Sequence, residues 1–209
     1  MVAKFTEHEF EKLKQTIRLY EWAHRIMMTK LGIIHESHKY FESTNPISSV
    51  TGRMKTPASI AGKLHNDNLE LTAENARAHL KDIAGIRIIC PYAKDIFYMA
   101  DMIREMPDIK IVNEKDFVTN PKPSGYRSYH IIAEVDVYHS GKTETLPVEI
   151  QIRTEAMNFW ATLEHQAKYK YQNDIPKHLS DELVVCATKI SELDDRMYLI
   201  YELISMINA

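Results

Sequence analysis

The stretch NPKPSGYRSYH, residues 120–130, gathers basic and hydrogen-bonding side chains around one tyrosine. It contains Lys122, Tyr126, Arg127 and His130, with a proline on each side of the lysine. Two prolines and a glycine cannot continue a helix, so the stretch is expected to be a turn or loop. Such a loop has the chemistry to hold a phosphorylated, aromatic ligand. The alternative interpretation is a basic, solvated hairpin loop.

Charged residues also interrupt two apolar runs. Asp82 immediately precedes the run IAGIRII, and Arg87 lies inside it. Both need partners, because burying an unpaired ionised group is costly. In VEIQIRT, strand alternation places Glu149, Gln151 and Arg153 on one face and the apolar residues on the other. The apolar face is therefore core, whereas the polar face suits either a ligand or water with charge pairs.

The carboxylates of Asp82 and Glu149 are expected on neighbouring strands, where they could hold Mg²⁺. Magnesium usually takes one or two protein carboxylates and completes its coordination with phosphate oxygens and water. Phosphates at such a site would require cations. The sequence offers Arg53, Lys55, Lys63, Arg87, Lys122, Arg127 and Arg153.

The first of these cations surround a short expected helix. Arg53 and Lys55 precede it, and it carries Ser59 and Lys63, so these residues could converge on one phosphate chain. The sequence contains no Walker motif and no GxGxxG. A nucleotide would therefore be bound by another design.

Hydrophobic periodicity predicts the elements that must position these residues. Helices are expected over residues 6–41, 57–64, 71–80, 95–106, 155–169 and 179–207. Strands are expected in DIAGIRIICPY, IKIVNEKDFV, IIAEVDVY and LPVEIQIRT, the last two joined by a turn at residues 139–142. Gly32 could break the first helix, and Asn45-Pro46 opens a linker. This order predicts an α+β fold in which helices flank a small mixed sheet.

The composition is that of an ordinary globular protein, with 209 residues, 44% hydrophobic and 26% charged. A net charge of −3 argues against wholesale coating of nucleic acid, although a local basic patch is compatible with it. Cys90 and Cys186 are expected to be reduced core residues, and Trp160 and Phe159 are also expected in the core. The sequence shows no signal core and no run of membrane-spanning length, which predicts a cytoplasmic protein without a membrane partner.

Four blocks carry a family resemblance. In order, GRMKTPASIAGKL, DIAGIRIIC, NPKPSGYRSYH and VEIQIRTEAMNFWATLEH resemble the synthetase domain of the RelA/SpoT family, specifically its short, single-domain alarmone synthetases. The resemblance covers roughly Ser49 to Tyr171. It implies a nucleotidyltransferase-like synthetase core over residues 45–171, between a helical region at residues 1–44 and a C-terminal helix at residues 172–209.

The resemblance also implies a reaction: ATP donates its β,γ-pyrophosphate to the 3′-hydroxyl of GDP or GTP, in a Mg²⁺-dependent transfer. Asp82 then matches the metal-binding aspartate, Glu149 the catalytic glutamate that binds metal or helps to deprotonate the hydroxyl, and Tyr126 the tyrosine that stacks on the acceptor base. The other acceptor positions are matched by His130, Gln151, Asn158 and Glu164, and the ATP positions by Arg53, Lys63 and Arg87. From their places beside these residues, Lys122, Arg127 and Arg153 are added to the acceptor site, and Lys55 and Ser59 to the ATP site.

Two departures from the family pattern bear on the acceptor. LHNDN follows Lys63 where short synthetases commonly continue with basic residues, and Pro123 stands where many carry a glutamate. The rival acceptor is the 3′-terminal adenosine of tRNA, as in toxin-like members of the family, which would need a basic patch. The candidate residues are Arg18, Arg25, Lys30 and Lys39 on the first helix and Arg77 with Lys81 on another, although a solvated helix face is the simpler explanation of these charges.

Two further alternatives concern the class of protein. A nucleotide-binding regulator that has lost catalysis would not need Asp82, Glu149 and Arg87 together. A hydrolase domain is not expected, because no His-Asp dipeptide occurs. The apolar stripe of the C-terminal helix could pack on its own domain, form a homo-oligomer or bind an antitoxin protein.

Overall fold

The computed structural model describes residues 5–170 and 175–207, and its centre is a five-stranded sheet with the strand order β1-β2-β5-β4-β3. The strands are β1 Ser49–Met54, β2 Ala84–Cys90, β3 Ile109–Asp116, β4 Tyr129–His139 and β5 Lys142–Thr154. β2 and β5 are parallel, whereas the other neighbouring pairs are antiparallel. The sheet is therefore mixed, as the sequence predicts.

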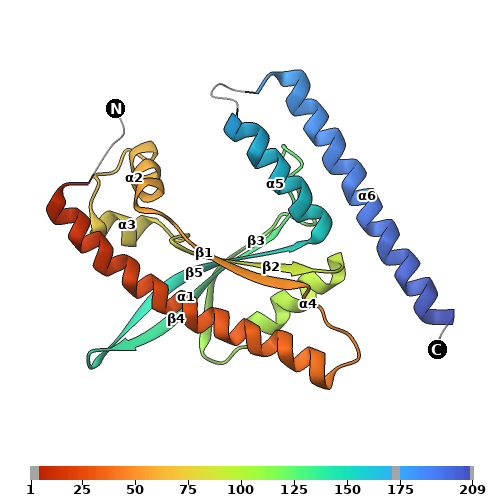
Figure 1. Cartoon of the computed structure of the whole chain (residues 1–209), viewed down its shortest axis with the longest axis horizontal. Helices are drawn as coiled ribbons and strands as arrows, with labels where there is room; N and C mark the ends of the chain where they lie inside the picture. Colours follow the sequence, from red (N-terminus) through yellow and green to blue (C-terminus); the bar gives the residue numbers. More distant parts are fainter. Residues whose placement is uncertain (1–4, 171–174, 208–209) are drawn as a thin grey trace.

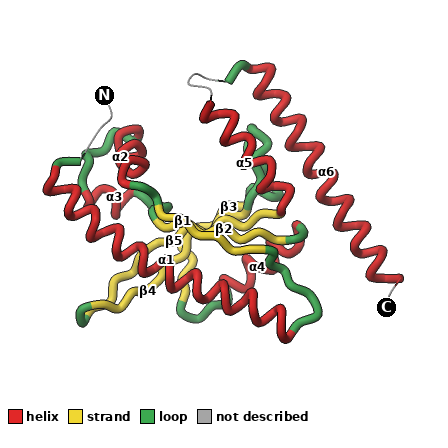
Figure 2. The backbone as a smooth tube through the Cα atoms, viewed as in Figure 1, coloured by secondary structure: helices red, strands yellow, loops and turns green. Residues whose placement is uncertain are grey.

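The helices of the described chain are α1 Glu7–Phe41, α2 Pro57–Asn66, α3 Ala73–His79, α4 Ala93–Arg104, α5 Glu155–Lys170 and α6 Lys177–Ile207. α1 and α4 pack against the sheet, α2 and α3 lie near the N-terminal end of α1, and α5 and α6 stand side by side at the other end (Figure 1). Figure 2 shows the sheet between α2 and α3 on one side and α5 and α6 on the other, with the β4–β5 hairpin extending beyond them. The expected α+β fold is confirmed.

One face of the sheet and one stripe of α1 form the main core. Leu13, Met27 and Leu31 of α1 are fully buried, and so are Ile150 and Ile152 of β5. Full burial of such a side chain contributes about 1.5–3 kcal/mol. The core face of β5 is the one that alternation predicts, so the polar residues of this strand lie on the opposite face.

The turn expected at residues 139–142 is also confirmed. Between β4 and β5, Ser140 has φ 47° and Gly141 has φ 80°. Two successive positive φ values are what a two-residue hairpin turn requires, since they match the twist of the flanking strands.

Two local predictions are wrong. Residues 49–54 form β1, where the sequence suggests only the continuation of a linker. Gly52 interrupts the alternation of side chains by which a strand is recognised. Glycine is needed at this position because a Cβ would lie 2.1 Å from the imidazole Nε2 of His24. α1 also continues unbroken through Gly32. An internal glycine costs only about 1 kcal/mol relative to alanine, and the fully buried Leu31 beside it holds the helix on the core.

The expected core residues divide into two groups. Cys90 is buried and Trp160 is only 5% exposed, as predicted, whereas Phe159 is 58% exposed and Cys186 is exposed. α6 explains the difference, because it covers α5 on the side of Trp160, whose indole Nε1 donates to the Leu183 carbonyl over 2.9 Å. The domain boundary expected between residues 171 and 172 lies outside the described residues.

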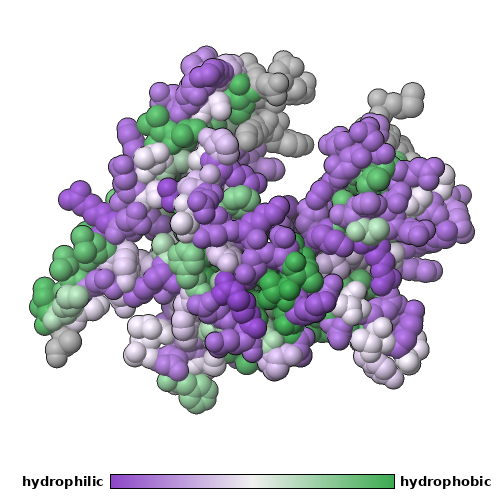
Figure 3. All heavy atoms as spheres, turned by 180° about the vertical axis from the view of Figure 1, so that it is seen from behind, coloured by the Kyte–Doolittle hydropathy of each residue, from purple (hydrophilic) through white to green (hydrophobic). Residues whose placement is uncertain are grey.

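The apolar stripe of α6 changes role along the helix. Ala187 packs with Trp160 and α5, whereas Met197, Ile200 and Ile204 are 54%, 43% and 52% exposed. Figure 3 shows apolar atoms gathered on the surface at the C-terminal end of this helix. Within residues 5–170 and 175–207, no helix combines the length and apolar character needed to cross a bilayer.

Candidate active site

Asp82 lies at the entrance to β2 between two lysines. Lys55 Nζ is 2.5 Å from Asp82 Oδ2, and Lys63 Nζ is 2.9 Å from Asp82 Oδ1. Burial acts to raise the pKa of Asp82, but the hydrogen bonds and charges of the two lysines outweigh it, and the pKa is lowered. The carboxylate is therefore ionised and well held at neutral pH.

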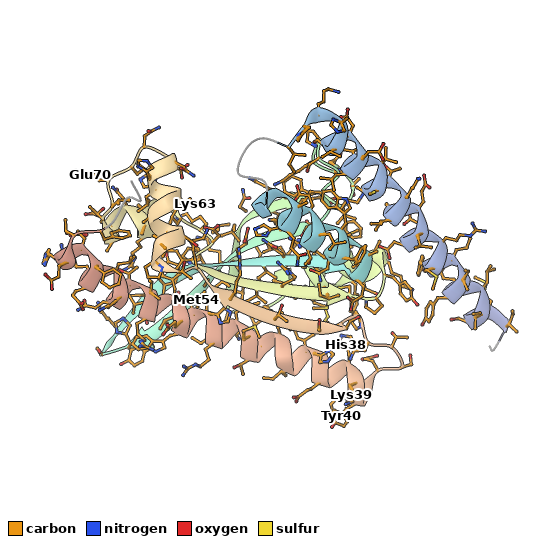
Figure 4. All side chains as sticks on the ribbon, turned by 45° about the horizontal axis from the view of Figure 1, so that its top comes forward. His38, Lys39, Tyr40, Met54, Lys63 and Glu70 are labelled. Carbon is orange, nitrogen blue, oxygen red and sulfur yellow. The ribbon has the colours of Figure 1, made fainter. Side chains whose placement is uncertain are left out.

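Local structure explains how the two lysines reach one carboxylate. Lys55 directly follows β1, and its backbone N–H donates to the Ile83 carbonyl over 2.8 Å, beside Asp82. Lys63 lies on α2, which begins with the N-cap Thr56 accepting from the Ser59 backbone N–H over 3.2 Å. Figure 4 shows Lys63 on this helix above Met54, the last residue of β1. The predicted convergence of these lysines is found, and Ser59 lies in the first turn of the same helix.

Glu149 lies on β5, next to Gly85 of β2 and Ile132 of β4 in the sheet register. Its Oε1 is 3.4 Å from His130 Nδ1, and its Oε2 accepts from Gln151 Nε2 over 3.0 Å. Burial acts to raise the pKa of Glu149, whereas His130 and Gln151 lower it further than burial raises it. The charge of Asp82 acts in the raising direction, which shows that the two carboxylates influence each other.

The donor set fits Mg²⁺ under one condition. The described residues contain no group of three or more histidine, cysteine or acidic side chains that could hold a metal alone. Asp82 and Glu149 together supply the one or two carboxylates that magnesium usually takes, with phosphate and water completing the set. A bound phosphate chain is therefore part of the site that these residues can form.

Arginines form a second group on the polar face of the sheet. Burial is the largest of the effects that lower the pKa of Arg87, and the positive charges of Arg153 and Arg53 lower it further. Arg87 Nη1 donates to Asn158 Oδ1 of α5 over 3.3 Å, whereas its buried Nε has no partner in the described part of the chain. Three guanidinium groups this close favour an anionic or aromatic ligand between them.

Two adjoining cavities follow these arginines. One of about 170 Å³ is lined by Arg53, Arg87, Glu149 and Gln151. Another of about 360 Å³ shares Arg53 and Arg87 and extends to Arg153 and Glu164. Tyr126 also lines the second cavity.

The loop around Tyr126 is held in place by its own contacts. The Tyr126 hydroxyl accepts from Arg153 Nη2 over 2.6 Å and lies 2.8 Å from His130 Nε2. Lys122 Nζ lies 5.0 Å from the centre of the Tyr126 ring, and the Arg153 guanidinium lies at the same distance. At Gly125, with φ 87°, a Cβ would lie 2.5 Å from the Ala187 Cβ of α6. Glycine therefore lets α6 support the loop.

One predicted loop residue takes another position. Arg127 Nη1 donates to the Val118 carbonyl over 3.0 Å and lines a narrow space beside Trp160. This contact ties the loop to the chain leaving β3. The structure brings Lys122, Tyr126 and His130 together, whereas Arg127 points away from them toward Val118 and Trp160.

Three residues of the predicted tRNA patch have carboxylate partners. Arg18 pairs with Glu21 at 2.7 Å, Lys30 with Asp108 at 2.5 Å and Arg77 with Glu144 at 2.7 Å. Arg25 is exposed on α1. Lys39 and Lys81 are exposed as well, and like Arg25 they have no carboxylate within 4.0 Å among the described residues.

Sequence reasoning missed a further cavity of about 620 Å³ that also reaches Glu149. It is lined by His130 of β4, Lys115 of β3 and Tyr20 of α1, and by Lys81 in the segment that follows α3. Lys115 reaches the cavity because it lies opposite His130 in the β3–β4 pair, a register that the structure shows and the sequence analysis did not predict. Tyr20 carried no such signal, because its α1 position reads simply as core.

Two carboxylates between cavities lined by cations form a candidate site for a ligand that carries phosphates. Residues 52–174 match the family model for the region found in RelA / SpoT proteins. The chain therefore belongs to the RelA/SpoT family, and it is a pyrophosphokinase of the small alarmone synthetase kind.

Similar proteins support this assignment over nearly the whole chain. GTP pyrophosphokinase YwaC of Bacillus subtilis is 40% identical over 187 residues, which cover 90% of this chain and 89% of that protein. The structure of small alarmone synthetase 1 of B. subtilis bound to its product pppGpp superposes with a TM-score of 0.84 at 35% identity, covering 90% of this chain and 96% of that one. The same synthetase bound to AMPCPP gives a TM-score of 0.78 at 31% identity, covering 93% and 98%.

Proposed function

We propose that this protein transfers the β,γ-pyrophosphate of ATP to the 3′-hydroxyl of GDP or GTP, in a reaction that requires Mg²⁺. The observation that carries the proposal is the position of Glu149, which lines both the arginine cavity and the larger cavity beside His130. A transfer between two bound nucleotides needs two compartments that meet at the reacting atoms. The structures of small alarmone synthetase 1 of B. subtilis bound to pppGpp and to AMPCPP support nucleotides as the substrates.

The chemistry assigned to each residue follows from its contacts. The acceptor 3′-oxygen forms a bond to the β-phosphorus of ATP, the bond between that phosphorus and the α,β-bridging oxygen breaks, and AMP leaves. Glu149 is ionised at neutral pH and accepts the hydroxyl proton, with His130 fixing its orientation. Asp82 and Glu149 would hold Mg²⁺, which would supply charge neutralisation to the phosphates.

The cations complete the site. Lys55 and Lys63 are placed to exchange Asp82 for donor phosphate oxygens, and Arg53 and Arg87 to hold the adenosine part of ATP. Tyr126 offers its ring to the acceptor base. This is catalysis by positioning and electrostatic stabilisation, as expected for phosphoryl transfer.

The alternatives receive less support. A tRNA acceptor would use Arg18, Lys30 and Arg77, which are paired with carboxylates. An inactive regulator would leave the Asp82–Glu149 pair without a purpose. A homo-oligomer or antitoxin contact would use the exposed end of α6, and neither choice alters the chemistry above.

A transfer assay tests the function directly. ATP labelled with ³²P at the γ-phosphate is incubated with Mg²⁺ and with GDP, GTP or deacylated tRNA, and the Glu149→Gln protein is the control. We expect label on GDP and GTP and none on tRNA. Label on tRNA alone, or wild-type turnover by Glu149→Gln, would contradict the proposal.

A further inference from the structure

Asp194 is a partly buried carboxylate on α6 whose contact with the rest of the domain is a single residue. Its Oδ2 accepts from the Thr154 hydroxyl over 2.6 Å. Burial raises the pKa of Asp194 more than this hydrogen bond lowers it, and within the described residues no cation acts on the carboxylate. Whatever Asp194 does in the folded protein therefore passes through Thr154.

Thr154 connects this carboxylate to the start of α5. It is fully buried, ends β5 and directly precedes α5. Its hydroxyl accepts from the Met157 backbone N–H over 3.1 Å, which is the N-cap hydrogen bond of the helix. A hydroxyl has one proton, so donation to Asp194 leaves its lone pairs for the Met157 N–H. Donation to an ionised acceptor also strengthens the bond that the same oxygen accepts. Asp194 therefore fixes the first turn of α5.

That turn leads directly to a residue of the arginine group. Asn158 follows Met157, and its Oδ1 accepts from Arg87 Nη1 over 3.3 Å. The positive charges of Arg153 and Arg53 act against the charge of Arg87. The buried Nε of Arg87 has no partner in the described part of the chain. Because like charges repel, the guanidinium needs an acceptor to stay in this position, and Asn158 supplies one.

Arg87 carries the effect into the nucleotide site. It lines both arginine cavities, where it is assigned to ATP. In the described chain no residue of α6 lines either cavity, and Asp194 lies beside the narrow space next to Trp160. The contact of α6 with the acceptor loop is made by Ala187, two helical turns before Asp194. Asp194 thus reaches the cavities through three consecutive hydrogen bonds and not through the loop.

We propose that Asp194 is a positioning residue for the ATP site, which holds Arg87 in place through Thr154, the first turn of α5 and Asn158. The inference rests on the proposed function and deepens it, because it extends the donor site to a helix that does not line it. Asp194 touches no reacting atom, so its loss should weaken donor binding without changing the chemical step itself.

The test is a titration of AMPCPP by calorimetry in the presence of Mg²⁺. The proteins are the wild type, Asp194→Ala, Asp194→Asn and Glu192→Ala, whose exposed carboxylate lies on the same helix and serves as the matched control. We expect Asp194→Ala to weaken AMPCPP about fivefold, the equivalent of one net hydrogen bond. Asp194→Asn keeps an oxygen that accepts from Thr154, so it should bind AMPCPP like the wild type. Glu192→Ala should also be unchanged.

A second background shows whether the effect travels through Asn158. In the Asn158→Ala protein the last contact of the route is absent, so adding Asp194→Ala should cause little further loss of AMPCPP affinity. A merely structural role would give the same loss in both backgrounds. Melting curves of all variants accompany the titrations. Because burial raises the pKa of Asp194, Asp194→Asn should melt at or above the temperature of the wild type at neutral pH.

Three results would overturn the inference. They are an unchanged AMPCPP affinity in Asp194→Ala, an equal loss in Asp194→Asn, and a full loss that persists in the Asn158→Ala background. If the wild type binds AMPCPP and labels GDP or GTP while one of these results is found, the inference fails alone. If the wild type binds no AMPCPP, the proposed function fails with it.

Discussion

The two sides of Glu149 hold their positive charges differently. At Asp82, Lys55 and Lys63 are paired with the carboxylate. In the cavity beside His130, Lys81 and Lys115 have no carboxylate within the described residues. A phosphate ligand on the first side must replace Asp82 as the partner of Lys55 and Lys63. A ligand on the second side enters the positive electrostatic potential of lysines that have no carboxylate partner. The first arrangement stabilises the fold before binding, and the second keeps its electrostatic energy for the ligand.

Glu149→Gln should impair the chemistry on both sides of the site, because this residue lines both cavities. We expect the transfer rate to fall about a thousandfold, since the amide cannot accept a proton. The fold should persist, because the β5 core face is untouched. The rate is measured with labelled ATP, and Glu134→Gln, a carboxylate change in the same cavity, is the control. A normal rate in Glu149→Gln would remove this residue from the mechanism.

Lys55→Met should damage the paired side in two ways. The Lys55 side chain is 13% exposed, and its loss leaves Asp82 with Lys63 alone. We expect unfolding free energy to fall by about 1–3 kcal/mol and transfer to slow about a hundredfold. Urea unfolding and initial rates measure the two effects. Lys81→Met is the comparison, and a similar loss of stability there would contradict the contrast between the sides.

Lowering the pH should also test the contribution of the paired carboxylates to stability. The pKa values of Asp82 and Glu149 are lowered in the folded protein, so the folded state binds fewer protons than the unfolded state. Their stabilisation is complete above the unfolded pKa values of about 4 and is lost as pH falls through the folded values. We expect the melting temperature to decline below about pH 4, and to decline less in Lys55→Met than in the wild type. Parallel melting curves from neutral pH to pH 3 would show whether pairing has this effect.

Gly125→Ala tests how α6 supports the acceptor loop. The added Cβ would meet Ala187 at 2.5 Å with φ at 87°. Destabilisation of about 1–3 kcal/mol is expected, together with weaker acceptor binding. Gly141→Ala is the matched control, because it has φ 80° and no atom within 4 Å of the added Cβ. Equal losses of stability and binding in both variants would mean that strain, and not contact with α6, decides the effect.

Tyr126→Phe should give the smallest change. It keeps the ring and removes the hydroxyl that accepts from Arg153 and lies beside His130. We expect the KM for GDP to rise about threefold, the equivalent of one modest hydrogen bond. Tyr126→Ala should raise it more, since the stacking surface is lost. An equal rise in the two variants would show that the hydroxyl, and not the ring, matters.

Much of the candidate site could be predicted because its residues combine chemistry with local pattern. Glu149 and Gln151 alternate with apolar residues on a strand, so their shared face follows from the period of two. Lys63 lies on a helix whose start is predicted by the N-cap residue Thr56 and by Pro57 in the first turn. Such signals need only neighbouring residues. β1 was missed because Gly52 is required by its close approach to His24 on α1, a contact between distant segments.

The sequence by itself determined the class of fold, the family and the two carboxylates, because strand and helix periods and ordered motifs are local properties. Only the tertiary structure decided which charges meet. It paired Lys55 and Lys63 with Asp82, neutralised Arg18, Lys30 and Arg77, and left Lys81 facing a cavity with Tyr20. Ion pairing depends on distances of a few ångströms between segments far apart in the chain. No pattern of neighbouring residues contains those distances.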